Sequence, residues 1–319
     1  MCVLAIEFRG FEQGAFEVAS RGQCLQNCDD AGNLGTENLM EITSRPESLS
    51  RYLNPARFAN DLWQGRAVLV RFAAREVSLR YRGARLGAAW IFLQPLFLLA
   101  VYTVAFSLIM KLKWPESQRA GLGEVAMAVY CGLTAFGVFS ECASRAPTLL
   151  MENQNYVKRA RFPVQMLPVC VALSASFHGL VNLAVLIMLG WIVGGFYAPA
   201  LLAPIFLMPL ILLSCGVALL LAVTGPIFRD LKQFIPPVLL AISFLTPMVY
   251  SPRLVPERLK WLVIGNPLAF AITSIRELVM WRGAGDWAAL GIWMVIGAGF
   301  MVGAYAVFMR LKYEVTDLV

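Results

Sequence analysis

Charged side chains are scarce in this chain, and over one long stretch they are missing altogether. Only 15% of its 319 residues are charged, against roughly 25% in an ordinary soluble domain. No Asp, Glu, Lys or Arg occurs between Arg161 and Arg229. A buried helix of a soluble protein needs a much shorter uncharged run, whereas two membrane spans of about 20 residues each need most of this one. The composition therefore predicts an all-α integral membrane protein.

The residues of common catalytic and nucleotide-binding sites are also missing. The chain has 1 histidine, and it lacks the Gly-Lys pair that the phosphate loop G-x-x-x-x-G-K-[ST] requires. It contains neither H-E-x-x-H nor G-x-S-x-G. No carboxylate or lysine is expected near the middle of a span, where ion-coupled carriers usually keep one. These absences disfavour an enzyme, a bound cofactor and an ion-driven carrier. Energy for any transport would then come from elsewhere.

The 7 cysteines and the net charge of +7 favour neither a metal site nor a nucleic-acid partner. Cys24 and Cys28 form a C-x-x-x-C pair without a nearby histidine, which is a weak metal signal. The basic residues flank apolar runs, so we interpret them as determinants of membrane orientation. The first residues hold too short an apolar run for a signal peptide.

The chain changes character near residue 50. Residues 1–50 hold 3 basic and 8 acidic residues, which predicts a mobile cytoplasmic extension. Residues 51–85 are amphipathic and rich in arginine, so we expect a helix in the cytoplasmic headgroup layer, or one packed on a partner protein. Residues 86–319 are expected to form the transmembrane domain.

Hydropathy predicts six spans, at about 86–110, 124–141, 166–193, 200–224, 234–250 and 287–309. The apolar stretch Trp261–Ile275 has only 15 residues and is interrupted by Asn266-Pro267. We expect it to form two short external re-entrant helices between spans five and six. With the N-terminus inside, cytoplasmic segments after residue 50 carry 16 basic residues and external segments carry 8. Both termini are therefore expected in the cytoplasm.

Two groups of side chains within the spans are candidate pore residues. Ser174, His178 and Asn182 recur every four residues, so they share one helical face. They could line a pore or meet a second copy, although hydrogen bonding between helices is the commoner use of such a stripe. The second group is aromatic and could stack on sugar rings, with core packing or an interfacial belt as the alternative. It comprises Tyr102, Phe106, Tyr130, Phe136 and Phe139.

Four motifs follow one another in the order of a known family. They are LRYRGARLGAAWIFLQPL at 79–96, TLLMENQNYVKRARFP at 148–163, IFRDLKQF at 227–234 and TPMVYSPRLVPERLKWLVIGNPLAFAITSIRELVM at 246–280. Through them, residues 66–319 resemble the permease subunits of type-2 ABC exporters of O-antigen, capsule or teichoic acid. Each motif is weak alone, and the ordered set is specific. Thr134-Ala135 stand where many relatives have Pro-Trp, and the acidic extension is unlike the family.

The resemblance implies a homodimer in the cytoplasmic (inner) membrane that binds two copies of a separate ATPase subunit. Residues 148–156 would form a coupling helix that rests on the ATPase, with Thr148, Glu152, Asn153 and Tyr156 as its contacts. Such directional contacts can transmit a rigid-body motion.

The same resemblance implies an undecaprenyl-diphosphate-linked polysaccharide as cargo. Its pyrophosphate would meet Arg80, Arg82 and Arg85, since guanidinium pairs with phosphate oxygens bidentately, and contact with lipid headgroups is the alternative. An external gate would be built around Tyr250, Pro256, Asn266 and Pro267. An exporter of a drug or lipid, and a membrane-embedded glycosyltransferase, are the rival interpretations.

Overall fold

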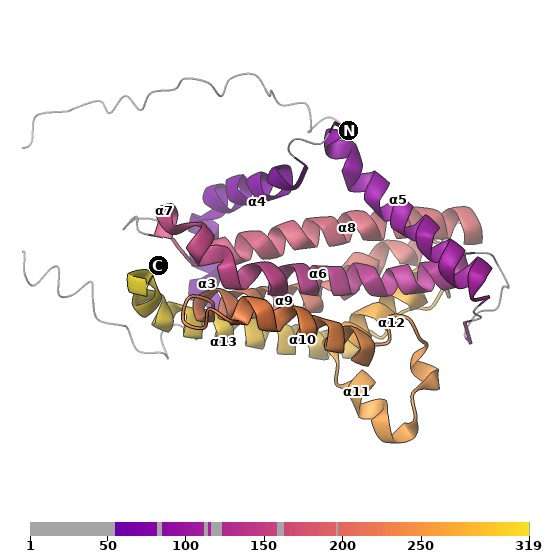
Figure 1. Cartoon of the computed structure of the whole chain (residues 1–319). Coiled ribbons are helices and arrows are strands. Elements are labelled where there is room, and N and C mark those ends of the chain that lie inside the picture. Colours follow the sequence, from indigo (N-terminus) through magenta and orange to yellow (C-terminus); the bar gives the residue numbers. More distant parts are fainter. Residues whose placement is uncertain are drawn as a thin grey trace, which may run out of the picture. The chain divides into compact units, whose positions relative to one another are not determined.

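The computed structural model describes residues 55–81, 85–111, 114–115, 123–157, 163–195 and 197–318 (Figure 1). All of them belong to one unit, Glu47–Val319. The predicted extension 1–50 and Arg82 lie outside the described residues. No strand occurs within the described ranges, whose residues form helices joined by turns.

The elements follow in chain order. They are α3 (Pro55–Gln64), α4 (Arg66–Tyr81), η1 (Gly87–Ala89), α5 (Trp90–Tyr102), η2 (Thr103–Ile109), α6 (Glu124–Glu152), α7 (Gln154–Val157), α8 (Met166–Gly194), η3 (Ala198–Leu202), α9 (Ala203–Thr224), α10 (Leu231–Leu245), η4 (Pro252–Leu254), η5 (Glu257–Leu259), α11 (Lys260–Ile264), α12 (Pro267–Val279) and α13 (Trp287–Leu318).

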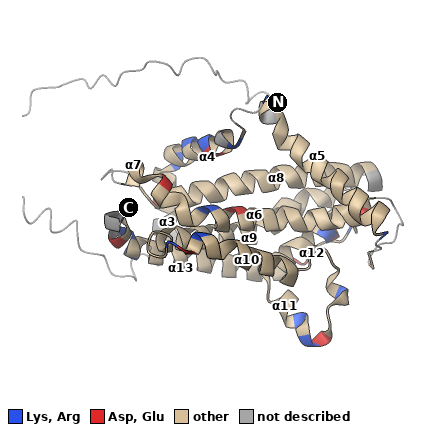
Figure 2. Ribbon diagram, viewed as in Figure 1, with Lys and Arg blue, Asp and Glu red and all other residues tan. Residues whose placement is uncertain are grey.

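Five stretches are long and apolar enough to cross a membrane, and a bent helix pair gives a sixth if it is counted as one span. The five are Trp90–Ile109, Glu124–Glu152, Met166–Ile192, Ala198–Thr224 and Trp287–Lys312. They confirm an all-α integral membrane protein. Figure 2 shows charged residues gathered on α4, α11 and the connecting turns, with the long helices mostly uncharged.

The prediction for span two was wrong at its end. We expected the span to stop at Glu141, but α6 continues to Glu152 as one helix of 29 residues. A charged residue usually marks the end of a span, but the Glu141 carboxylate has basic partners within the protein. The helix therefore carries Glu141 and Arg145 inside it, which also corrects the expectation that no carboxylate lies near the middle of a span.

The prediction for span five was also wrong in its bounds. We expected a span at 234–250, whereas α10 runs from Leu231 to Leu245. It ends where Thr246 takes an extended backbone conformation, with φ −94° and ψ 139°. A helix of 15 residues is about 22 Å long at 1.5 Å per residue, short of the roughly 30 Å of a bilayer core.

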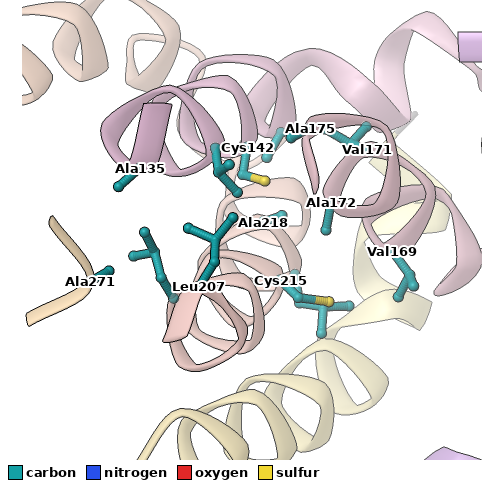
Figure 3. Packing of buried hydrophobic residues seen from close by; sticks show 14 of the residues in the cluster. Ala135, Cys142, Val169, Val171, Ala172, Ala175, Leu207, Cys215, Ala218 and Ala271 are labelled. Atoms are coloured by element: carbon teal, nitrogen blue, oxygen red, sulfur yellow. The ribbon is translucent and has the colours of Figure 1, made fainter. Parts of the chain in front are cut away.

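The core of the bundle is formed by α6, α8, α9 and α13, whose contact surfaces are rich in small residues (Figure 3). Alanine and cysteine allow close helix approach, because packing between membrane helices depends on van der Waals contact. At Gly225 a Cβ would lie 2.0 Å from the carbonyl oxygen of Pro147, so only glycine allows the end of α9 to approach α6 this closely.

The first span is peripheral by comparison. Only 6% of its apolar window is buried, against 72% for α6. It begins as α5 and continues in the π-helical turns of η2. Its apolar side chains therefore face either lipid or another protein chain.

The expected interface helix is two helices, broken at Gly65. A Cβ there would lie 2.4 Å from the methyl carbon of Met166, so glycine allows the close approach of α8. Before the break, α3 packs on α13 through Phe58 and Tyr305, whose ring centroids are 4.6 Å apart. The Tyr305 hydroxyl donates to Asp61 Oδ2 at 2.5 Å. After the break, α4 packs along α8.

The stretch Trp261–Ile275 forms two helices, α11 and α12, as the broken hydropathy predicted. The segment Glu257–Ile264, which comprises η5 and α11, meets α12 at a bend of 88° across Gly265 and Asn266. Asn266 caps α12, because its side chain accepts a hydrogen bond from the Leu268 N–H at 2.9 Å. Pro267 occupies the first helical position, where a missing N–H costs little.

Candidate transport site

A polar pocket of about 650 Å³ lies between α4, α6, α8 and α10. Sequence reasoning had singled out three of its residues, namely Arg80, His178 and Asn182, without relating the first to the other two. The rest of its polar lining was not predicted as part of a site: Glu76, Thr134, Ser140, Glu141, Ser144 and Arg145. The third member of the predicted stripe, Ser174, does not line this pocket and is 1% exposed.

Arg80, Glu141 and His178 form the centre of this pocket. The Arg80 Nη1 donates to Glu141 Oε2 at 2.9 Å and lies 3.2 Å from His178 Nδ1. His178 Nδ1 is 3.5 Å from the other carboxylate oxygen of Glu141. Arg80 of α4 and His178 of α8 thus both contact the Glu141 carboxylate of α6. These contacts offset the free-energy cost of placing a carboxylate within a span.

A second ion pair borders the same pocket. The Arg145 guanidinium donates to the Glu76 carboxylate, which joins α6 to α4. The two pairs explain why α6 continues through Glu141 and Arg145 as a regular helix: both charges are compensated by α4.

The five aromatic residues predicted to line a channel lie in different surroundings. Tyr102 and Phe106 stack on each other, with ring centroids 5.9 Å apart. Tyr130 is 2% exposed and borders a small cavity beside Arg80 and His178. Phe136 and Phe139 are half-buried against the main core.

The predicted coupling helix 148–156 is not one helix. Thr148 and Glu152 belong to the last turns of α6, the helix breaks at Asn153, and a single turn, α7, follows. Asn153 Nδ2 donates to the Leu149 carbonyl at 2.9 Å, which caps the end of α6.

The predicted coupling residues divide between two environments. Thr148 and Glu152 line a groove of about 440 Å³ together with Arg229, from the turn before α10, and Lys232, from the first turn of α10. Tyr156 instead accepts a hydrogen bond from Arg75 Nη1 at 2.9 Å. This contact holds α7 against α4.

The predicted gate residues lie around the bend before and within α12. Asn266 Nδ2 donates to Thr246 Oγ1 at 3.0 Å. The Tyr250 hydroxyl donates to the carbonyl oxygens of Phe244 and Leu245, each at 3.2 Å. Pro256 directly precedes η5. In Figure 1, α11 and α7 lie at opposite ends of the bundle.

One functional candidate near the gate was missed, namely Arg276 in α12. Its side chain is fully buried and donates to the carbonyl oxygens of Ala128, Pro247 and Met248 at 2.8, 2.7 and 2.5 Å. Its guanidinium also lies 4.6 Å from the Trp114 ring centroid. The sequence signal was a charge at the end of a short apolar helix.

Comparison with known proteins fits this arrangement. The model of the family described as ABC-2 type transporter matches residues 68–280. The chain belongs to this family. Its members are permease subunits of transporters and not enzymes, and the chain is accordingly a multi-pass membrane protein.

Three relatives show which ABC-2 type transporters it is similar to. An O-antigen export system permease protein RfbA of Klebsiella pneumoniae is 24% identical over 256 residues, covering 79% of this chain and 95% of that protein. One of Myxococcus xanthus is 25% identical over 225 residues, covering 70% and 84%. The polysialic acid transport protein KpsM of Escherichia coli is 26% identical over 213 residues, covering 65% and 78%.

Proposed function

We propose that this chain is the channel-forming subunit of an exporter of undecaprenyl-diphosphate-linked polysaccharide, powered by a separate ATPase. The observation that carries the proposal is the family match together with relatives named for O-antigen export and polysialic acid transport. The lack of a phosphate loop agrees with an external source of energy. The excess of basic residues in segments 51–85, 153–165 and 225–233 supports a location in the cytoplasmic membrane with both termini inside.

The short helix α10 supports a homodimer. Its outer face exposes Phe234, Leu240 and Phe244, with fractional exposures of 64%, 60% and 74%. Lipid alone would cover this face poorly, because a helix of about 22 Å leaves non-helical backbone within a hydrocarbon core of roughly 30 Å. A second copy of the chain that packs on α10 and on the exposed α5 would bury the apolar side chains of both helices.

The groove beside the end of α6 is the proposed contact for the ATPase. It combines an exposed acid, Glu152, with two bases, Arg229 and Lys232, in one recess. A partner that inserts into the recess would contact both α6 and the turn before α10. A movement of the ATPase would then act on α6 and α10 at once.

Of the arginines predicted to contact the lipid pyrophosphate, the structure describes Arg80 and Arg85, and Arg85 is the better candidate. Arg85 is exposed. Arg80 already pairs with Glu141, so a phosphate would have to compete with that carboxylate. Headgroup anchoring by Arg85 would use the same phosphate chemistry.

Deletion of the gene tests the proposed export. The producing cell should lose a surface polysaccharide and accumulate the same polymer, still lipid-linked, on the inner side of its membrane. Complementation with the intact gene should restore surface polymer. An unchanged surface and no internal polymer would overturn the proposed function.

A further inference from the structure

The pocket between α4, α6, α8 and α10 has the size and lining of a ligand site. Its volume of about 650 Å³ falls within the roughly 300–1,000 Å³ of small-molecule pockets. Four elements contribute to it, and most of its side chains are polar. Such a cavity within a membrane bundle suits a ligand that forms many hydrogen bonds.

The charges of this pocket cancel one another. Arg80 pairs with Glu141, and Arg145 pairs with Glu76. An anion that entered would meet two carboxylates and would have to displace one of them from its arginine. Like charges at close range are strongly unfavourable where the dielectric constant is low. The pocket therefore favours a neutral ligand.

The cluster at the centre of this pocket keeps hydrogen-bonding capacity beyond its own ion pair. Arg80 Nη1 donates to Glu141 Oε2 at 2.9 Å and lies 3.2 Å from His178 Nδ1. The contact of His178 Nδ1 with Glu141 Oε1 is long, at 3.5 Å, and His178 Nε2 has no hydrogen-bond partner among the described residues. Both the carboxylate and the imidazole can therefore form further hydrogen bonds.

We propose that this pocket binds a neutral sugar ring of the exported glycan. Several hydroxyl groups on one small ring match a lining that offers both donors and acceptors. Ser140 and Ser144 of α6 and Asn182 of α8 add neutral hydrogen-bonding groups to the lining. The inference rests on the proposed function for the identity of the ligand, while binding itself requires no transport.

The single histidine of the chain provides a direct probe of the pocket. The sequence holds 1 histidine, so the imidazole signals of histidine-labelled protein report on His178 alone. Full-length protein without a histidine tag would be placed in lipid nanodiscs and followed by NMR. The probes are free glucose, galactose, mannose and N-acetylglucosamine as neutral sugars, with glucuronate and inorganic pyrophosphate as anions.

Gly137 allows the pocket to be blocked without disturbing its ion pairs. A Cβ at Gly137 would meet no atom within 4 Å, so Gly137→Leu can extend into open space. Gly291 in α13 is equally open and does not line the pocket, which makes Gly291→Leu the matched control. Ser140→Leu is a second blocking variant, should Gly137→Leu fail to fold.

At least one neutral sugar should shift the His178 signals saturably at millimolar concentration. Gly137→Leu or Ser140→Leu should weaken this binding by about tenfold or more, and Gly291→Leu should not change it. Shifts caused by pyrophosphate or glucuronate alone, or by no probe, would overturn the sugar site. If gene deletion left the surface polymer unchanged while a sugar still bound, the proposed export would fail and the site would stand.

Discussion

Replacing Arg276 with alanine should loosen the attachment of α12 to α6 and to the turn after α10. The wild-type guanidinium donates hydrogen bonds to three carbonyl oxygens, those of Ala128, Pro247 and Met248. A hydrogen bond to a charged group contributes about 1.5–3 kcal/mol, and the three share one side chain, so they do not add in full. Without the guanidinium, three buried carbonyl oxygens lose their donors at about 1–3 kcal/mol each, and we expect a total loss of about 3–5 kcal/mol because neighbouring losses do not add in full.

Thermal unfolding of the purified protein in detergent measures this loss. A change of about 1 kcal/mol shifts the midpoint by roughly 2–4 °C in a domain of this size, so the alanine variant should melt about 6–20 °C lower. Arg276→Met should be nearly as unstable, since methionine fills most of the volume of the side chain but provides no hydrogen-bond donor. Arg282→Ala, at an exposed arginine, should change the midpoint little. If Arg276→Ala melted within about 2 °C of the wild type, the reasoning about the buried guanidinium would be refuted.

Three further changes test the groove, the aromatic pair and the close helix approach. Glu152→Arg should lower transport-linked ATP hydrolysis severalfold, because it reverses the charge of the acidic residue in the groove. The control Glu257→Arg, at an exposed acidic residue of η5, should leave this rate unchanged. Equal rates of ATP hydrolysis in the two variants would argue against the groove as the ATPase contact. Joint replacement of Tyr102 and Phe106 by alanine should reduce glycan export more than ATP turnover, and equal losses in the two assays would indicate packing. Gly225→Ala should lower the unfolding midpoint, since its Cβ would lie 2.0 Å from a backbone carbonyl oxygen of α6; an unchanged midpoint would contradict this close approach.

Most of the spans could be predicted because the bilayer imposes a long uncharged run on the sequence. The stretches 166–192 and 198–224 lie close to their expected bounds for that reason. The break at Asn266 was also predictable, since Asn-Pro both caps and starts a helix.

The charged pocket could not be predicted from the sequence. Arg80 and Glu141 are 61 positions apart, and nothing in either neighbourhood indicates that they pair. Without the pairing, Glu141 looked like the end of a span and Arg80 looked like a free phosphate ligand. Long-range contacts of this kind depend on how α4 packs against α6 and α8, which periodicity does not specify.

The bounds of α10 were missed for a different reason. Hydropathy continues through Pro247, Met248 and Val249, so the apolar run is longer than the helix. The helix stops because the following carbonyl groups bond to Arg276 and Thr246 bonds to Asn266. Tertiary contacts at this point end the helix earlier than the apolar run of the sequence indicates.

Reconstitution tests the central claim that this chain is a conduit which another subunit must power. Proteoliposomes would contain the purified chain alone, or the chain with the separate ATPase subunit proposed to power it, together with lipid-linked glycan and ATP. Glycan should cross the membrane only when both proteins are present, and the chain alone should hydrolyse no ATP. ATP hydrolysis or glycan transfer by the chain alone would contradict that claim.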